Sequence, residues 1–491
     1  MIDQENGLPV GWTLTTLGQV CKTTSGGTPS RKFKEYFQGD IPWVKSGELP
    51  DNVISTVEEY ITKEALTNSS AKLFPEDTLL IALYGATVGK LGILKKTAAT
   101  NQAVCAIFPK VDLCTKYLFW YLRFIRSYLI SQAVGGAQPN INQSILQNLP
   151  IHLAPLPEQH RIVAEIEKQV SRLDEAVAGL KRIQANLKRY RASVLKSAVE
   201  GKLTAKWRKQ HPDTEPAEQL LQRILKERRE HWEQAEQEKM QGAGKPPKDD
   251  KWKQKYKEPI APDVSSLPVL PEGWIWGSFE QVAERVTVGF VGSMKHQYVD
   301  SGIPFLRSQN VRENRYEPQG LKYISQEFHQ QIKKSSLVPD DLVVVRSGSV
   351  GVTCVLPETL GIANCSDLVI IKRPIGFIPK YGAYYMNSIV NTRVASKKVG
   401  VALTHFNTQS VAQMPIPLPP LQEQTQIVLE IERRLSIADE VEQQINTNLK
   451  RAERLRQSIL KKAFSGRLVP QDSNDEPADM LLEKIKQAQR A

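Results

Sequence analysis

The sequence predicts a mixed α/β protein made of two tandem copies, in which each α/β domain is followed by a long helix. Two observations predict this: short motifs recur at a nearly constant spacing, and each copy ends in a long stretch with apolar residues every three or four positions. The charges along those stretches further predict that the two helices pair as an antiparallel coiled coil with pseudo-two-fold symmetry.

The repeat is visible in several motifs. Pro9-Val-Gly-Trp12 recurs 262 residues later as Pro271-Glu-Gly-Trp274, and Leu156-Pro-Glu-Gln recurs 265 residues later as Leu421-Gln-Glu-Gln. The stretch SVLKSAVEGKL at 193–203 recurs as SILKKAFSGRL at 458–468. Because the offset stays nearly constant across each copy, the chain is predicted to be a tandem duplication.

Each copy begins with strand-like runs bounded by Gly, Pro, Asp or Asn, followed by a helical stretch. The predicted strands are 79–83, 103–108, 342–345 and 368–371, and the predicted helices are 116–123 and 380–387. This order predicts a mixed α/β domain in each copy.

The second part of each copy has a narrow apolar seam typical of a coiled coil. Prolines precede each seam, while Gly201 and Gly466 follow the two seams and predict where the helices end. The seam residues are Ile162, Ile166, Val170, Leu173 and Val177 in one copy, and Ile427, Ile431, Leu435 and Ala438 in the other.

Both long stretches are acidic in their first half and basic in their second half. Antiparallel pairing would place each acidic half opposite a basic half. One exposed ion pair contributes less than ~1 kcal/mol, so the orientation would depend on many of them. The alternative is that the charges only suit the dipole of each separate helix.

These patterns divide the chain into six predicted segments. They are a first α/β domain (1–155), a first long helix (156–208), a charged hydrophilic linker with a helix (209–268), a second α/β domain (269–419), a second long helix (420–470) and a C-terminal tail helix (471–491).

Composition limits the possible partners and compartments. The 65 Lys and Arg exceed the 53 Asp and Glu, and the formal net charge of +12 favours a polyanionic partner. Without a signal-peptide pattern or an apolar run of about 18 residues, we expect a cytoplasmic protein that does not enter a membrane. The five cysteines and seven histidines lack ligand spacing, so we expect buried free thiols and no metal site.

Further matching motifs are the strands Ile41-Pro-Trp-Val-Lys-Ser46 and Ile303-Pro-Phe-Leu-Arg-Ser308 and the loop Ser25-Gly-Gly-Thr-Pro-Ser30. Together with the P-x-G-W openings, the E-Q motif before each helix and the repeated helix ends, they cover nearly the whole chain. In this doubled order the chain resembles the specificity subunit of a type I restriction-modification system.

The resemblance implies a non-catalytic subunit with two target-recognition domains, each reading one half of a bipartite site in double-stranded DNA. The helices would set the spacer and dock two DNA adenine methyltransferase subunits, which motor-nuclease (restriction) subunits would join. S-adenosylmethionine, ATP and Mg²⁺ would be used by those partners. The resemblance therefore implies no catalytic, cofactor-binding or metal-binding residue in this chain.

Two other functions stay open from the residues alone. One is a coiled-coil scaffold that reads no DNA. The other is a self-contained enzyme, which is supported only by the stretch Gly85-Ala-Thr-Val-Gly-Lys-Leu91. This stretch is similar to a phosphate-binding loop, but it lacks one spacer residue and the final Ser or Thr of that motif. A turn between two strands is the better interpretation of it. An N-P-P-F/Y element, which an adenine methyltransferase needs, is absent from the sequence.

Polar loops supply the candidates for DNA contact, because Arg and Lys can pair with guanine, Asn and Gln with adenine, and Ser and Thr with phosphates. For any single residue, an ordinary solvated loop is the alternative. The candidates are Thr24, Ser25, Thr28, Ser30, Arg31, Lys32, Lys45, Ser46, Tyr84, Thr87, Gln138 and Asn140 in the first copy, and Lys295, His296, Arg307, Ser308, Gln309, Asn310, Arg346, Ser347, Ser349, His405 and Asn407 in the second. The repeated helix ends supply candidates for partner binding: Val194, Leu195, Ala198, Ile459, Leu460 and Ala463.

Overall fold

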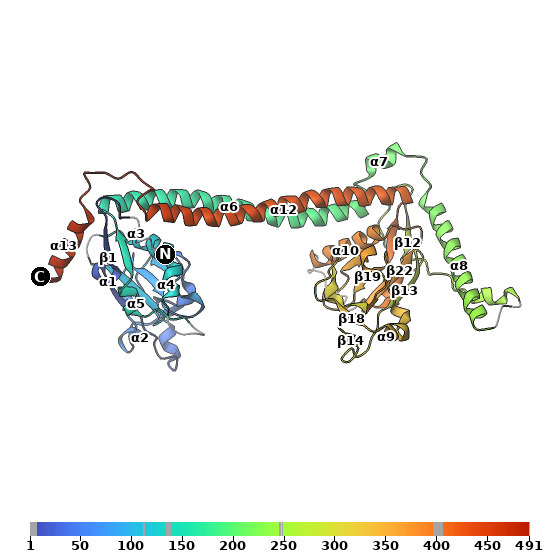
Figure 1. Cartoon of the computed structure of the whole chain (residues 1–491), viewed down its shortest axis with the longest axis horizontal. Coiled ribbons are helices and arrows are strands. Elements are labelled where there is room, and N and C mark those ends of the chain that lie inside the picture. Colours follow the sequence, from blue (N-terminus) through green and yellow to red (C-terminus); the bar gives the residue numbers. More distant parts are fainter. Residues whose placement is uncertain are drawn as a thin grey trace. The chain divides into compact units, whose positions relative to one another are not determined.

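The computed structural model describes residues 7–110, 113–133, 139–244, 247, 249–395 and 406–490. The chain divides into two compact units, shown in Figure 1. Unit 1 consists of Met1–Lys181 and Ile445–Ala491, and unit 2 of Arg182–Gln444. Each α/β domain therefore shares its unit with parts of both long helices.

Unit 1 contains a five-stranded sheet in the order β2-β10-β7-β8-β4, a four-stranded sheet in the order β5-β3-β9-β6, and the pair β1-β11. The strands are β1 (Thr13–Thr16), β2 (Cys21–Ser25), β3 (Ile41–Val44), β4 (Asn52–Ile54), β5 (Glu59–Ile61), β6 (Leu73–Phe74), β7 (Leu79–Ala82), β8 (Leu91–Leu94), β9 (Ala98–Thr100), β10 (Val104–Pro109) and β11 (Pro150–Leu153). The short helices are α1 (Leu17–Val20), α2 (Lys63–Thr67), α3 (Thr115–Phe124), α4 (Arg126–Ser131) and α5 (Gln143–Gln147).

The five-stranded sheet is buried on both faces. Alternate side chains of β7 point to opposite faces, so Leu79 and Ile81 pack with α3 and the long helices while Leu80 and Ala82 pack in a second core with Val44 of β3. Because both faces of the sheet are buried, every residue of β7 is apolar, and the run is continuously apolar in the sequence.

Unit 2 repeats this plan with the sheets β13-β22-β19-β20 and β14-β18-β15-β21 and the pairs β12-β23 and β16-β17. The strands are β12 (Ile275–Ser278), β13 (Ala283–Val288), β14 (Tyr298–Val299), β15 (Ile303–Leu306), β16 (Val311–Arg312), β17 (Arg315–Tyr316), β18 (Lys322–Ile324), β19 (Leu342–Val345), β20 (Thr353–Val355), β21 (Asn364–Cys365), β22 (Leu368–Pro374) and β23 (Pro415–Leu418). The helices of the domain are α9 (Gln326–Gln331), α10 (Pro379–Ala395) and α11 (Thr408–Ala412). The predicted strands and helices of both copies are confirmed.

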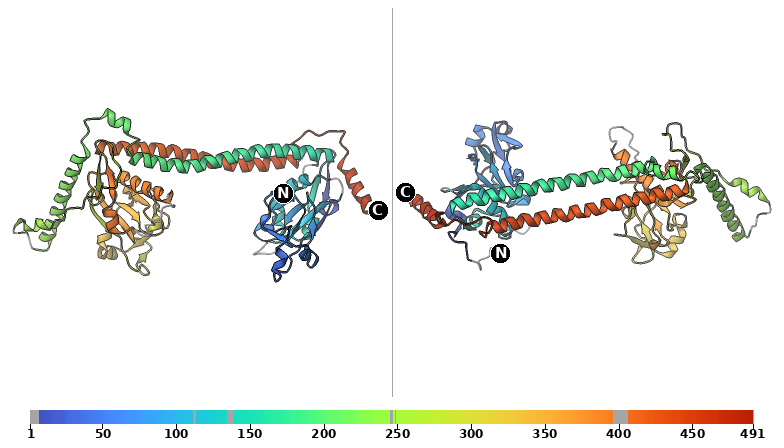
Figure 2. Two further views of the ribbon diagram at one scale, coloured as in Figure 1. Left: turned by 180° about the vertical axis from the view of Figure 1, so that it is seen from behind. Right: turned by 90° about the horizontal axis from the view of Figure 1, so that it is seen from above.

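The two long helices are also confirmed, as α6 (Leu156–Val199) and α12 (Leu421–Ala463). In unit 1 the start of α6 packs in one core with the end of α12, and in unit 2 the end of α6 packs with the start of α12 (Figure 2). An ion pair joins Asp174 to Arg456 in unit 1, and Arg191 lies 2.5 Å from Asp439 and 2.8 Å from Glu442 in unit 2. Each of these ion pairs joins a residue from the acidic half of one long helix to a residue from the basic half of the other.

Glycine ends each long helix. Gly201 and Gly466 both have a φ of +67°, a conformation that a side chain disfavours. A Cβ on Gly201 would lie 2.6 Å from Pro271, and one on Gly466 would lie 2.3 Å from Pro9. The helix ends and the P-x-G-W openings are thus in direct contact within each unit.

The predicted hydrophilic linker is more ordered than expected. Its helix α8 (Ala217–Gly242) follows the short α7 (Ala205–Gln210) and buries Leu220 and Ile224 in the core of unit 2. Trp232 stacks with Trp252, so the basic stretch packs on α8 as well. In unit 1 the tail helix α13 (Ala478–Arg490) docks in a similar way.

Two predictions about single stretches can also be compared with the fold. The stretch 85–91 is a turn between β7 and β8, with a short 3-10 helix at Gly85–Thr87, so it does not form a phosphate-binding loop that leads into a helix. In the part of the chain that is described, the helices are all too short or too polar to cross a lipid bilayer.

Candidate nucleic-acid interface

Each α/β domain is joined to its long helix by a buried tryptophan and a buried glutamate. The indole N–H of Trp12 donates to Glu158 over 2.9 Å, and that of Trp274 donates to Glu423 over 2.8 Å. Both carboxylates lie in the first turn of their long helix, where the helix dipole favours a negative charge. This contact explains why the P-x-G-W and E-Q motifs recur together.

The glutamine beside each glutamate fixes the junction further. Gln424 donates to the carbonyl of Pro419 over 3.0 Å and accepts the N–H of Ile378 over 2.9 Å. Gln159 makes the same pair of bonds in unit 1, to Ala154 and from Cys114. The two amides hold α10 and α3 to the starts of α12 and α6.

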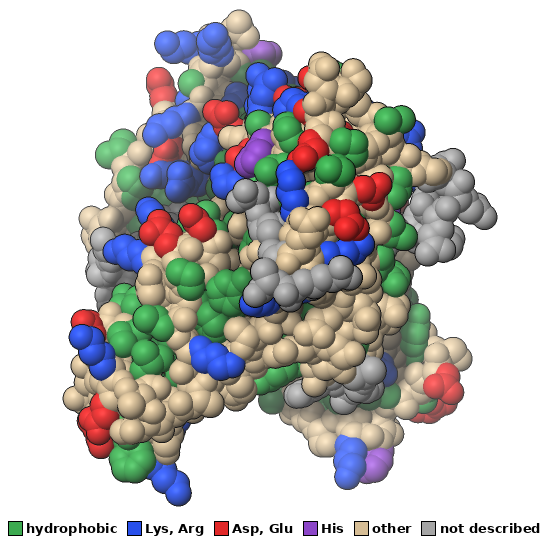
Figure 3. Space-filling view, turned by 90° about the vertical axis from the view of Figure 1, so that its left-hand side faces the viewer, with side chains coloured by type: hydrophobic (Ala, Val, Ile, Leu, Met, Phe, Trp, Pro, Cys, Tyr) green, Lys and Arg blue, Asp and Glu red, His purple; other side chains and the backbone are tan. Residues whose placement is uncertain are grey.

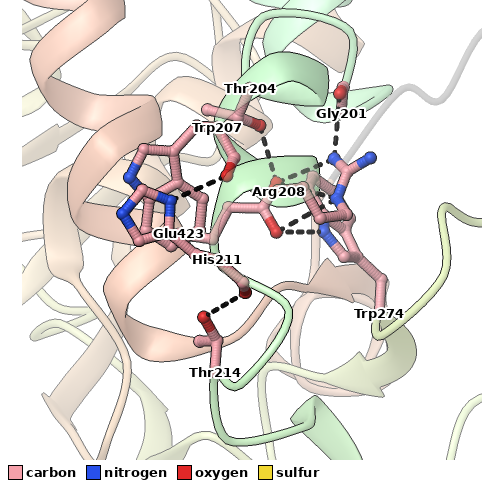
Figure 4. Close-up of polar contacts among 8 residues, drawn as sticks. All are labelled: Gly201, Thr204, Trp207, Arg208, His211, Thr214, Trp274 and Glu423. Carbon is pink, nitrogen blue, oxygen red and sulfur yellow. Dashed lines mark hydrogen bonds and ion pairs between the residues drawn. The ribbon is translucent and has the colours of Figure 1, made fainter.

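The junction of unit 2 has additional donors, drawn in Figure 4. Thr204 donates its hydroxyl to Glu423 over 2.7 Å, and Arg208 of α7 donates through Nε and Nη2, the shorter bond being 2.7 Å. Trp274 contributes its indole N–H. The carboxylate is therefore buried with its charge compensated, which is the condition for a stable buried ion.

The junction of unit 1 lacks such compensation. Oε1 of Glu158 is buried and has no hydrogen-bond partner among the described residues, and burial raises the pKa of Glu158 above its ordinary value. Arg161, whose charge acts on Glu158, forms a 2.6 Å ion pair with Asp475. The same motif thus has a satisfied carboxylate in one unit and a partly unsatisfied carboxylate in the other.

This difference predicts a pH dependence for unit 1. A carboxyl group whose pKa is higher in the folded state than in the unfolded state binds more protons when the chain is folded. The protonated form of Glu158 therefore adds to the free energy of unfolding at low pH. This stabilisation is lost as the pH rises from the ordinary pKa through the raised pKa. We expect Glu158→Gln to gain stability relative to the native chain as the pH rises from about 4 to 8. Urea unfolding across this range would measure it, and a constant difference would contradict the expectation.

The six predicted partner-binding residues at the helix ends have a different role. Val194, Leu195 and Ala198 lie in the core of unit 2, and Ile459, Leu460 and Ala463 lie in the core of unit 1, each 5% exposed or less. Because they pack the long helices onto the domains of this chain, they form no surface for another subunit. The prediction of partner binding is wrong for these six side chains.

The predicted DNA-contact loop of unit 1 is held close to the second sheet. A Cβ on Gly26 would lie 2.1 Å from Thr100, so only glycine fits this approach. The indole of Trp43 donates to the carbonyl of Gly27 over 3.1 Å, and Thr28 contacts Gln102 through its hydroxyl. Ser30 and Lys32 are exposed beyond this anchor.

Two cations of this loop region already have acidic partners. Arg31 lies 2.7 Å from Glu59, and Lys45 lies 2.8 Å from Glu58 and 3.0 Å from Glu59. Hydrogen bonds to these two carboxylates raise the pKa of Lys45. A DNA phosphate would have to compete with Glu58 and Glu59 for them.

The remaining described candidates of unit 1 lie on three segments, two of which meet. Tyr84 and Thr87 are on the turn after β7, and Tyr84 forms an isolated β-bridge with Asn140. Ser46 follows β3 and is half-buried. Gln138 lies outside the described residues.

In unit 2 the segment after β15 is only partly available. Asn310 is fully buried and donates to the carbonyls of Glu317 and Gln319, so it holds a turn and cannot contact DNA. Arg307 donates to the carbonyl of Gly320 over 2.6 Å, while Ser308 and Gln309 are exposed. The prediction of a DNA contact is wrong for Asn310, because the asparagine amide serves the turn.

The other candidates of unit 2 lie on three loops. Arg346, at the position of Tyr84 in the other copy, forms a 2.6 Å ion pair with Asp367, and Ser347 and Ser349 beside it are exposed. Asn407 caps α11 by accepting the N–H of Ser410. Lys295 and His296 are exposed before β14, whereas His405 lies outside the described residues.

Sequence reasoning missed a row of polar side chains along β2 of unit 1. Thr24 accepts a 2.6 Å hydrogen bond from Lys72, and Ser25 accepts one of 3.0 Å from Gln143. Only the hydroxyls were predicted, since Lys72 and Gln143 are distant in the sequence. The sequence signal that could have indicated this row is the polar run Lys22-Thr-Thr-Ser25, which forms a strand.

Cysteines and acidic residues show no reactive or metal-binding arrangement in the described ranges. Four of the five thiols are buried, and burial raises the pKa of Cys21, Cys105 and Cys354 to about 12. Groups of three or more His, Cys, Asp or Glu side chains that could hold a metal ion are absent from these ranges.

Comparison with known proteins decides the family. The family model of the type I restriction modification DNA specificity domain matches residues 9–188 and again residues 290–451. The chain belongs to this family. Each match starts in one α/β domain and extends along a long helix, so the chain contains two copies of the DNA specificity domain.

Some relatives match this chain along most of their length. The specificity subunits of the Escherichia coli enzymes EcoKI (strain K12) and EcoBI are 24% and 25% identical to this chain, over 99% and 95% of it and 96% and 86% of their own lengths. The EcoR124I/EcoR124II specificity subunit of Escherichia coli is 30% identical over 31% of this chain. That match and one to the Methanocaldococcus jannaschii MjaIX subunit span only 39% and 38% of those relatives.

Solved structures show the fold of this specificity subunit. A chain from a type I R-M system covers 94% of it with a TM-score of 0.63 and 19% identity. The HsdS subunit from Thermoanaerobacter tengcongensis covers 95% of it with a TM-score of 0.53 and 18% identity.

Proposed function

We propose that this specificity subunit directs a type I restriction-modification complex to a bipartite DNA sequence, with residues 1–155 and 269–419 each reading one half. The observation that carries the proposal is the double match of the DNA specificity domain to two units that repeat one plan but differ in their polar loops. Different loops on one scaffold suit two different half-sites, because sequence is read by side chains and not by the fold.

We propose further that α6 and α12 form an antiparallel coiled coil with pseudo-two-fold symmetry that sets the spacer between the half-sites. The ion pairs Asp174–Arg456 and Arg191–Asp439 support this pairing. A helix of 44 residues is ~66 Å long at ~1.5 Å per residue, which corresponds to about two turns of DNA at ~34 Å per turn.

The partners follow from the same proposal. Two DNA adenine methyltransferase subunits would bind the pseudo-symmetric chain, and motor-nuclease subunits would join that core in the cytoplasm. S-adenosylmethionine, ATP and Mg²⁺ would be used by these partners, while this chain contributes recognition only. Exposed faces of the long helices remain for docking, since the apolar helix ends are buried.

Exchanging one recognition domain tests the proposal. We expect that replacing residues 9–150 with the corresponding domain of another specificity subunit will change one half of the methylated motif and leave the other half unchanged. Methylome sequencing of cells that express the exchanged chain with its methyltransferase would show this. The same motif after the exchange would instead indicate a scaffold that reads no DNA.

A further inference from the structure

A basic basin lies at the start of strand β2 in unit 1. Its volume is about 620 Å³, and its polar lining comes from Gln19, Lys22, Thr23, Lys110, Gln147 and Asn148. Asp and Glu are absent from its described lining. A cavity with two ammonium groups, amides and hydroxyls but no carboxylate is suited to an anion.

The basin continues as a row of ordered donors along β2. Gln147 donates to Thr23 over 3.2 Å, Lys72 to Thr24 over 2.6 Å and Gln143 to Ser25 over 3.0 Å. An ammonium group has three N–H donors and an amide has two, and in these contacts each uses one toward the described residues. The remaining donors are therefore held on both faces of β2, the outermost strand of the five-stranded sheet: Gln147 and Gln143 on the face of Thr23 and Ser25, and Lys72 on the face of Thr24.

The second copy shows that the fold does not require these residues. At its matching edge strand β13, Lys22 and Thr23 correspond to Glu284 and Arg285. Glu284 forms a 3.2 Å ion pair with Arg373, and Gln147 corresponds to Ala412 of α11. Since the same scaffold forms with Glu284 in place of Lys22 and Ala412 in place of Gln147, the fold does not require these two side chains of unit 1.

We propose that this edge of unit 1, comprising the basin and the donors along β2, is a track for the phosphate backbone of DNA. The proposal rests on the proposed function and adds the surface that holds the duplex. Lys22, Lys72 and the glutamines would hold phosphates, so they would position the domain without choosing bases. Figure 3 views the chain from the side of unit 1: charges of both signs crowd the upper part, and below it Lys and Arg side chains lie with a few Asp and Glu side chains among uncharged and hydrophobic ones.

Salt-dependent DNA binding by the assembled complex tests the track. We expect Lys22→Ala and Lys72→Ala each to reduce the slope of log K against log salt concentration by about 0.9, and to weaken binding up to about eightfold at 0.1 M salt. The loss should be equal for target and non-target duplexes, and the methylated motif should stay the same. Both side chains are exposed, so folding is preserved.

Lys226→Ala is the matched control. It removes the same charge from an exposed helix position in unit 2, and we expect the slope to stay unchanged. An unchanged slope for the Lys22 and Lys72 variants, a loss confined to the target sequence, or an equal loss in the control would overturn the track. Absence of DNA binding by the unsubstituted complex would instead reject the proposed function.

Discussion

Replacing Glu423 with glutamine is expected to lower the free energy of unfolding of unit 2 by about 3 to 5 kcal/mol, the range for breaking a buried ion pair. The variant leaves Arg208 without its counter-charge and gives the Thr204 hydroxyl and the Trp274 indole a weaker acceptor. Urea unfolding followed by hydrogen exchange of β12 and α12 would measure the change and assign it to unit 2.

Glu158→Gln is the matched control for this prediction. The same substitution at the same place in the repeat removes a carboxylate that has one donor, Trp12, and one buried oxygen without a partner among the described residues. We therefore expect no loss of stability at pH 7. Equal losses for the two variants would show that the carboxylate charge matters in both units and that the Arg208 contact does not distinguish them.

Lengthening both long helices is expected to change the DNA spacer. One heptad inserted after Ala185 in α6 and another after Gln444 in α12 keeps the apolar seam in register and adds ~10 Å at ~1.5 Å per residue. We expect methylation of the original bipartite site to be lost and a site with a spacer longer by about three base pairs to be preferred, at ~3.4 Å per base pair. Methylome sequencing would give both the motif and the spacer.

A matched insertion controls for the added length. Seven residues placed after Pro262, in the segment before β12, lie outside both long helices, so we expect the motif and its spacer to be unchanged. The same spacer after the double helix insertion would exclude α6 and α12 as the element that sets it.

Local periodicity made most of the fold predictable. The strands around Leu79 and Leu342, the long helices and their glycine ends all follow from patterns within a few residues. The opposed charges of the long helices were also visible, and Arg456 and Asp174 do form an ion pair. The mixed α/β class follows from these elements.

Burial of single side chains was not predictable in the same way. Leu195 and Leu460 look like free surface at a repeated helix end, but they are covered by the domains that pack there. Asn310 looks like a base-reading amide, but its partners are carbonyl groups of a turn that forms only in the folded domain. The contact between Lys72 and Thr24 was likewise not predictable, because these two residues are distant in the sequence and come together only through the order of the strands in the fold.

The contact of Pro9 with Gly466 has a consequence for the order of folding during synthesis. Unit 2 is one continuous segment, so all of its residues are synthesised before residues 445–491. Unit 1 needs Ile459, Leu460 and the helix α13 to complete its core, and these residues follow unit 2 in the chain. Domains generally fold as units during translation. Unit 2 should therefore reach its native state first, because unit 1 can complete its core only after residues 445–491 have been made.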